Sequence, residues 1–287
     1  MQVPQQEQYV VTLSCPDKGG ILRAVPHYLL SAGCSIEDSQ QYKDIDAGLI
    51  FMRTCVCTEQ SLETLSEGLA NVTNSFSFLT EWQIRPAHQK MRTLIMVSKF
   101  GHCLNDLLFR VSTNALPIEI AAVVSNHHDL EALVGSYGIP FHHIPVAKDT
   151  KAEAEACLLG LIESENIELV ALARYMQILS DDLSKRLSGR IINIHHSLLP
   201  SFKGAKPYHQ AHARGVKLIG ATAHYVTADL DEGPIIEQDV EPVGHWHTPD
   251  ELVAIGRDIE CRVLARALKA HSEHRVLLNG RRTVMFA

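Results

Sequence analysis

Two polar residues end a short apolar run in the second half of the chain. Asn193 and His195 lie two positions apart in the segment 190–195, which otherwise consists of an arginine and three isoleucines. Residues i and i+2 of an extended segment point to the same side, so this amide and this imidazole project together. Such a pair can polarise a carbonyl oxygen and move a proton. The segment therefore predicts acid–base chemistry at a carbonyl group.

A carboxylate farther along the chain can reach the same place. Asp231 lies in the loop 227–234, which ends in Gly-Pro and follows a predicted strand at 219–227. Taken singly, each of the three residues has a plainer explanation. His195 can be a hydrogen-bonded histidine at a strand end, Asp231 a turn carboxylate, and Asn193 a loop cap.

The elements that must position these residues form a predicted α/β domain. The strand 168–173 is apolar on both faces, which is typical of a parallel sheet covered by helices on both sides. Ligands of such doubly wound, Rossmann-type sheets bind outside the carboxyl ends of the strands, where Asn193 and His195 lie. We expect strands near 93–98, 118–124, 141–145, 168–173, 190–194, 219–227 and 235–240, and helices near 103–112, 128–136, 150–164, 181–187 and 249–271.

The first part of the chain has a different order of elements. Strands are expected at 9–14, 34–42, 48–57 and 76–84, and helices at 21–31 and 60–72. This βαββαβ order predicts a ferredoxin-like antiparallel sheet with both helices on one face. We expect a first domain at 1–85, a polar linker at 86–91 and a second domain at 92–287.

Composition excludes some classes of function. The 287 residues carry a net charge of −7, which argues against a dominant surface for nucleic acid or anionic membrane. Seven cysteines without a Cys-x-x-Cys spacing indicate reduced thiols. The polar start of the chain does not resemble a secretory signal, and no apolar run is long enough to span a membrane. We expect a cytoplasmic protein.

The runs 193–204 and 220–236 resemble the folate-dependent formyltransferase family. They match its pattern Asn-x-His followed by Ser-Leu-Leu-Pro and Gly, and later His followed by Asp-x-Gly-Pro-Ile. The resemblance covers the whole second domain and implies that Asn193, His195 and Asp231 are catalytic. It implies that the folate substrate is bound by Met176, Gln177, Ile178, Leu179, Val226, Thr227, Gly204 and His224. Lys206 is a candidate for contact with the anionic tail of the folate, and a solvated loop lysine is the alternative.

The turn between the first strand and the first helix carries a second resemblance. The run 15–21, Cys-Pro-Asp-Lys-Gly-Gly-Ile, is similar to the corresponding turn of ACT domains. This likeness implies subunit pairing into a homo-oligomer and an amino-acid effector near Asp17, Gly19 and Gly20. A plain turn is the alternative for these three residues.

An ACT-like domain before a formyltransferase-like domain resembles the deformylase subgroup of this family. That likeness implies hydrolysis of 10-formyltetrahydrofolate to tetrahydrofolate and formate, which would supply purine biosynthesis. Related transferases hold an acceptor phosphate on a glycine-rich loop, whereas the loop 98–105 has one glycine. Water is then the nucleophile, and either Asp231 or His195 takes its proton.

Two alternatives remain, and each makes a different prediction. A transferase would pass the formyl group to an amine, and a non-catalytic folate or amino-acid sensor would bind without turnover. Although the chain has 16 histidines, it lacks a His-Glu-x-x-His motif or a paired Cys/His spacing. We expect neither a metal nor a cofactor, because folate is the substrate.

Overall fold

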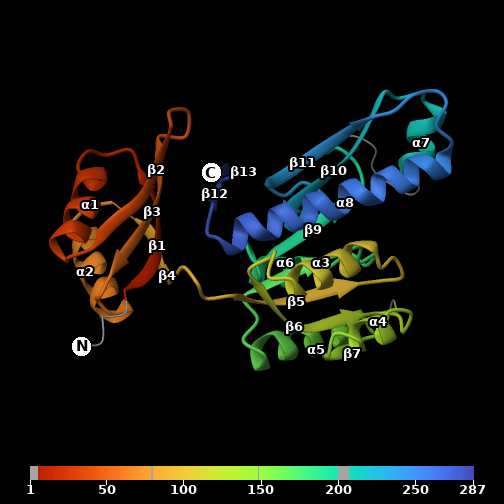
Figure 1. Cartoon of the computed structure of the whole chain (residues 1–287), viewed down its shortest axis with the longest axis horizontal. Helices are drawn as coiled ribbons and strands as arrows, with labels where there is room; N and C mark the ends of the chain where they lie inside the picture. Colours follow the sequence, from red (N-terminus) through yellow and green to blue (C-terminus); the bar gives the residue numbers. More distant parts are fainter. Residues whose placement is uncertain (1–5, 79, 148, 200–206) are drawn as a thin grey trace. The chain divides into compact units, whose positions relative to one another are not determined.

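The computed structural model describes residues 6–78, 80–147, 149–199 and 207–287. The chain forms two compact units, shown in Figure 1. The first unit contains residues 1–89 together with 273–277 and 284–287, and the second contains 90–272 and 278–283. No helix of the described residues combines the length and apolarity that a membrane span requires.

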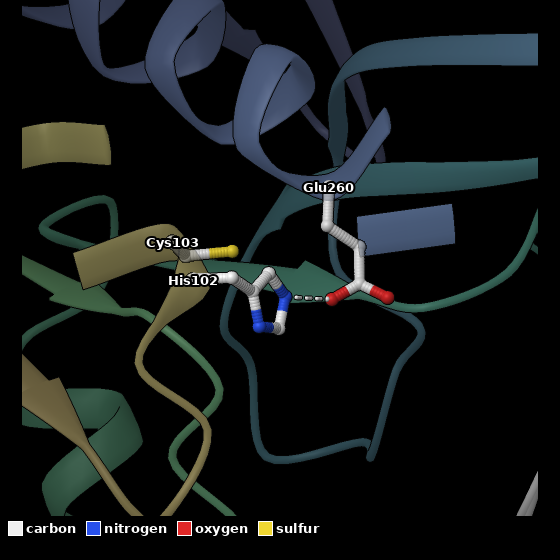
Figure 2. A group of neighbouring side chains, drawn as sticks. All are labelled: His102, Cys103 and Glu260. Atoms are coloured by element: carbon white, nitrogen blue, oxygen red, sulfur yellow. Dashed lines mark hydrogen bonds and ion pairs between the residues drawn. The ribbon is translucent and has the colours of Figure 1, made fainter. Parts of the chain in front are cut away.

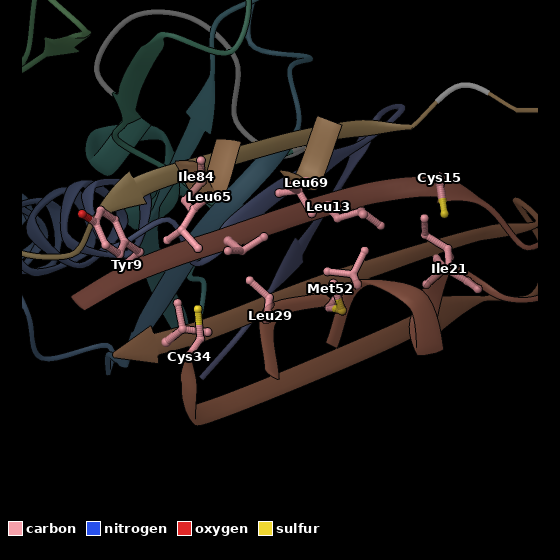
Figure 3. Close-up of a cluster of buried hydrophobic side chains, with 14 residues drawn as sticks. Tyr9, Leu13, Cys15, Ile21, Leu29, Cys34, Met52, Leu65, Leu69 and Ile84 are labelled. Carbon is pink, nitrogen blue, oxygen red and sulfur yellow. The ribbon is translucent and has the colours of Figure 1, made fainter. Parts of the chain in front are cut away.

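The first unit has the expected βαββαβ order. Its elements are β1 (Glu7–Pro16), α1 (Ile21–Ser31), β2 (Ser35–Asp44), β3 (Leu49–Thr58), α2 (Leu62–Asn74) and β4 (Glu81–Pro86). The sheet order is β2-β3-β1-β4, and all neighbours are antiparallel. Alternate residues of the strands face the two helices, so that Leu13 and Met52 pack with Leu29, Leu65 and Leu69 in one buried cluster (Figure 3). The ferredoxin-like prediction is confirmed.

The opposite face of this sheet is covered by the end of the chain. Phe51 of β3 is fully buried and packs with Val284 and Phe286. The guanidinium of Arg53 donates to the carbonyl oxygens of Glu273 and His274, at 3.1 and 3.2 Å. The second unit is therefore not the uninterrupted span 92–287 that we expected. An apolar residue on the second sheet face needs a cover, and strand periodicity does not reveal which distant segment provides it.

The second unit contains the other elements. They are β5 (Met91–Val97), α3 (His102–Ser112), β6 (Ile118–Ser125), α4 (Glu131–Gly135), β7 (Phe141–His143), α5 (Lys151–Ser164), β8 (Leu169–Leu172), α6 (Asp181–Arg186), β9 (Ile191–His195), α7 (Pro207–Ala213), β10 (Leu218–Tyr225), β11 (Ile235–Pro242) and α8 (Pro249–Ser272). The last strands, β12 (Val276–Asn279) and β13 (Arg282–Met285), form a hairpin, and each has residues in both units. The connection from β4 to β5 is shorter than the expected linker, because β4 ends at Pro86 and β5 begins at Met91.

Seven strands of this unit form one sheet in the order β11-β10-β9-β8-β5-β6-β7. Strands β5 to β9 are parallel, and β10 and β11 add an antiparallel edge. Leu94 and Val170 pack with Leu158 of α5 and Leu183 of α6 on one face. Ile95 follows Leu94 in β5 and therefore points to the opposite face of the sheet. It is also fully buried, so that face is covered as well. The predicted doubly wound sheet is confirmed.

The strand order reverses beside β5, because β6 lies on one side of it and β8 on the other. Such a switch point opens a crevice at the carboxyl ends of the strands. Here Ser98, which follows β5, accepts a hydrogen bond from the amide of Met176, which follows β8, at 3.0 Å. The topology thus brings the segments after β5, β8 and β9 to one end of the sheet.

Candidate active site

The carboxyl end of β9 presents Asn193 and His195. Strand β10 runs antiparallel to β9, with His224 opposite Asn193 and Thr222 opposite His195. Residues paired across a ladder point to the same face, so this register adds His224 to the pair. Asn193 Nδ2 lies 3.2 Å from His224 Nε2. Strand periodicity predicted the first two positions, and the register of a second strand supplies the third.

The loop after β10 brings Asp231 back to these residues. Its Oδ2 lies 3.3 Å from His195 Nδ1, and its Oδ1 lies 3.7 Å from His224 Nε2. Gly233 allows this return, because a Cβ there would lie 1.8 Å from the carbonyl oxygen of Tyr225. Asp231 itself has a φ of 55°, a left-handed conformation that is uncommon for residues other than glycine. Such local strain is typical of residues held in place for function.

The charge of Asp231 follows from these neighbours. Hydrogen bonding to His195 lowers the pKa of Asp231 well below its usual range, and the nearby His224 adds to the effect, although partial burial opposes the shift. The carboxylate is therefore ionised at neutral pH. It fixes the Nδ1 side of the His195 ring, which is 5% exposed. His195 Nε2 is buried and has no hydrogen-bond partner among the described residues, so it is the nitrogen that can serve a ligand.

His224 acts on Asn193 more directly than on a ligand. The ring is 2% exposed, and its Nδ1 lies 2.9 Å from the carbonyl oxygen of Tyr225. A carbonyl accepts only from an N–H group, so Nδ1 carries a proton, and Nε2 faces the Asn193 amide nitrogen, which can only donate. Nε2 then accepts from Asn193 Nδ2, which orients the amide. The expected substrate residue His224 does line the pocket, but both of its ring nitrogens are engaged.

A pocket of about 250 Å³ surrounds this group. Its wall includes Leu172, Tyr175, Ser184, Ile194, Ala228 and Leu230 beside the residues expected to bind substrate, namely Met176, Gln177, Ile178, Leu179, Val226 and Thr227. Met176, Ile178 and Leu230 are 53%, 60% and 57% exposed. Exposed apolar side chains around a concave site favour a flat, partly apolar ligand. Gly204 and Lys206, the remaining expected residues, lie outside the described residues.

Two further pocket residues, Arg174 and His196, were not among the predicted site residues. Burial lowers the pKa of His196 to about 4, and the charges of Arg174 and His195 add to the effect. His196 is therefore neutral at neutral pH. Arg174 directly follows the apolar run 169–173. A charged residue at the end of a buried strand was the signal in the sequence that could have identified it.

Beside the pocket, a second buried carboxylate organises three elements. Glu260 of α8 is 1% exposed and accepts hydrogen bonds from His102 of α3 at 2.7 Å and from Tyr208 of α7 at 2.8 Å. Arg174 Nε lies 3.5 Å from the same carboxylate. The ring of Tyr208 reaches Glu260 by lying across Gly256, which precedes Glu260 by one turn of α8. A Cβ at Gly256 would lie 2.1 Å from the tyrosine ring, so only glycine leaves room for it.

Figure 2 shows His102, Cys103 and Glu260 together, and these residue types can bind metal ions. Burial raises the pKa of Glu260, but hydrogen bonding from His102 and the charge of Arg174 outweigh it, so the pKa is lowered and the group is ionised. Hydrogen bonding to Cys261 and burial raise the pKa of Cys103, which keeps its thiol protonated. Arg174 already balances the carboxylate, so we interpret the group as an ion-pair cluster.

The expected effector residues lie in the turn between β1 and α1 of the first unit. Asp17 forms an ion pair with Lys43. Gly20 has a φ of 109° and lines an open groove of about 740 Å³ with Arg23 and His27. Gly19 has open space around it, because no atom lies within 4 Å of a Cβ built there. The groove contains one of the three expected residues, and their role stays a prediction.

Comparisons with known proteins give the family of this chain. The formyl transferase family matches residues 91–268. A formyltetrahydrofolate deformylase of Corynebacterium sp. is 52% identical over 98% of this chain and 99% of its own length. The Escherichia coli deformylase is 39% identical over 97% of this chain and 98% of its own length.

Solved structures give the same result. A formyltetrahydrofolate deformylase of Burkholderia mallei is 50% identical, with a TM-score of 0.94 over 98% of this chain and 100% of its own. A glycinamide ribonucleotide transformylase of Symbiobacterium toebii is 29% identical, with a TM-score of 0.64 over 74% of this chain and 98% of its own. With this likeness over nearly its full length, the chain belongs to the formyltetrahydrofolate deformylase family, within the formyl transferases.

Proposed function

We propose that this protein hydrolyses 10-formyltetrahydrofolate to tetrahydrofolate and formate, at the site of Asn193, His195 and Asp231. The observation that carries the site assignment is their convergence at one pocket, with His195 held by Asp231 on one nitrogen and unpartnered on the other. The deformylases that are similar to this chain over almost its full length support the reaction.

In the proposed reaction, the oxygen of a water molecule attacks the formyl carbon. His195 Nε2 takes the water proton, because the lowered pKa of Asp231 makes its carboxylate a weak base. Asp231 keeps the His195 ring oriented and stabilises the imidazolium that forms. Of the two acceptors that the sequence leaves open, the structure favours the histidine.

Asn193 stabilises the tetrahedral intermediate. Its Nδ2 carries two N–H groups, one of which donates to His224, and the other is available to the developing oxyanion. Loss of one such donor typically costs about 2.7–4 kcal/mol in the barrier. The intermediate then collapses, the C–N10 bond breaks, and His195 returns its proton to the folate nitrogen. Formate leaves, and one proton passes to solvent.

The test is incubation of the purified protein with 10-formyltetrahydrofolate, with and without glycinamide ribonucleotide. Formate should appear at the same rate in both samples, and no formylated amine should form. Formyl transfer that requires the amine would instead support the transferase, and tight folate binding without turnover would support the sensor. The same assay with a chelator checks the expectation that neither metal nor cofactor is needed.

The first unit is proposed to pair subunits and to bind an amino acid at the turn that contains Asp17, Gly19 and Gly20. The open groove beside Gly20 supports the second role, since Arg23 offers a charge for a carboxylate. Light scattering would determine the oligomer, and deformylation rates with each amino acid would reveal an effector. A cytoplasmic location is part of the proposal and can be checked by fractionation of cells.

A further inference from the structure

The catalytic pocket contains a cation that the proposed reaction does not use. Arg174 lines the same pocket as His195 and Asp231, and its side chain is 11% exposed. It is the one lysine or arginine among the described residues of the pocket wall. A buried guanidinium is costly unless it meets an anion, and Glu260 supplies one 3.5 Å from Nε, but the place of the guanidinium in the pocket wall still requires an explanation.

The backbone of Arg174 is held in a strained conformation. Its φ of 65° lies in the left-handed region, which glycine adopts freely and arginine rarely does. Ser98 fixes the backbone that follows, since its amide donates to the Arg174 carbonyl at 3.3 Å and its Oγ accepts from the Met176 amide at 3.0 Å. A strained position that carries a long charged side chain indicates that the side chain is needed there.

Glu260 positions the Arg174 guanidinium without accepting a hydrogen bond from it. The carboxylate lies 3.5 Å from Arg174 Nε, and each of its oxygens already accepts a shorter hydrogen bond, from His102 or from Tyr208. Nε has no hydrogen-bond partner among the described residues. The Phe100 ring, 5.8 Å away, packs against the guanidinium. Because Nε is buried against Glu260, the terminal N–H groups of Arg174, whose side chain is 11% exposed, are the donors available for an anion that enters the pocket.

His196 adds a neutral donor on the same wall. It follows His195 directly, with the two ring centres 5.2 Å apart. Because burial keeps the ring uncharged at neutral pH, His196 can donate one N–H group without repelling Arg174. The pair combines one fixed positive charge with a neutral polar group, which suits a small monovalent anion.

The proposed reaction produces such an anion beside a negative charge. Hydrolysis releases formate near the ionised Asp231, which repels it. We propose that Arg174 and His196 form a subsite that binds the formate product. This inference rests on the proposed function for the identity of the anion, whereas the charge and the geometry of the subsite do not depend on it.

Binding of ¹³C-labelled formate to the folate-free protein tests the subsite without any catalysis. We expect Arg174→Gln to weaken formate binding about tenfold or more, because it removes a charge-assisted contact. Arg174→Lys keeps the charge and should bind with intermediate affinity. Arg257→Gln is the matched control, since Arg257 is exposed and also packs on Phe100, 5.9 Å away, but does not line the pocket.

Inhibition of deformylation by added formate provides the second measurement. Formate should inhibit the wild type and the Arg257→Gln variant equally and the Arg174→Gln variant about tenfold less, whereas neutral formamide should not inhibit. Unchanged formate binding in Arg174→Gln would overturn the proposal, as would equal inhibition by formamide. If Arg174→Gln does not fold, Arg174→Lys provides the test. The proposal is overturned if Arg174→Lys binds formate as tightly as the wild type does and formamide binds to both proteins as tightly as formate. Formate binding without hydrolysis would leave the subsite standing and refute the proposed function.

Discussion

Two histidine–carboxylate pairs of the second unit, His195–Asp231 and His102–Glu260, are built differently. In the pair His195–Asp231, the carboxylate comes from a strained loop and the histidine keeps one unpartnered nitrogen at the pocket. In the pair His102–Glu260, the carboxylate comes from the long helix α8 and both of its oxygens are occupied. The same residue types thus serve chemistry where a histidine nitrogen remains open, and structural support where both carboxylate oxygens are occupied.

Removing the first carboxylate should have the largest effect. We expect Asp231→Asn to lower kcat about a thousandfold with little change in KM, because His195 loses the group that orients it and stabilises its charge. Steady-state kinetics check this. The control is Asp229→Asn in the same loop, an exposed residue that should retain wild-type kcat. A kcat for Asp231→Asn within tenfold of the wild type would contradict the assignment.

Removing the second carboxylate should affect stability more than turnover. Glu260→Gln leaves the buried guanidinium of Arg174 without its counter-charge, and breaking such a buried pair costs about 3–5 kcal/mol. Urea denaturation measures the free energy of unfolding, and Asp258→Asn on the exposed side of the same helix is the control. If Glu260→Gln unfolds like the wild type but loses most of its kcat, the two pairs do not differ as we describe.

His196 lies between the two pairs and should make stability depend on pH. Its ring neighbours His195 and, at 6.4 Å, Tyr208. The folded-state pKa of about 4 lies below the ordinary value of 6.5, so the unfolded chain binds more protons between these values. Stability contributed by this group is therefore complete above about pH 6.5 and falls as pH approaches 4.

We expect His196→Gln to remove on the order of 2 kcal/mol of that pH dependence between pH 7 and 4.5. Urea denaturation at both pH values, for the wild type and for the variant, provides the four free energies that are needed. Parallel pH profiles would show that the ring titrates normally in the folded protein.

The smallest effect is expected at the edge of the Glu260 cluster. Tyr208→Phe removes the hydrogen bond to Glu260 Oε1 but leaves the charge of Arg174 balanced, so we expect a loss of about 1–2 kcal/mol. Thermal and urea unfolding would check it. A loss as large as that of Glu260→Gln would mean that the hydrogen bond, rather than the ion pair, stabilises the cluster.

Local patterns in the sequence predicted much of the site. Two residues two positions apart in a strand had to share a face, which placed Asn193 and His195 together. The apolar strands and their order predicted a doubly wound sheet and the end at which ligands bind. The loop closed by Gly-Pro did return Asp231 to the strand end. Each of these inferences depends on neighbours in the chain, and such neighbours constrain each other directly.

Contacts between distant segments required the tertiary structure. The register of β10 on β9 decided that His224 faces Asn193, and helix packing decided that Glu260 meets Arg174. Likewise, the cover of Phe51 by Val284 and Phe286 joined the end of the chain to the first unit. Sequence periodicity specifies which face of an element is buried, whereas the choice of its partner depends on how all elements pack at once.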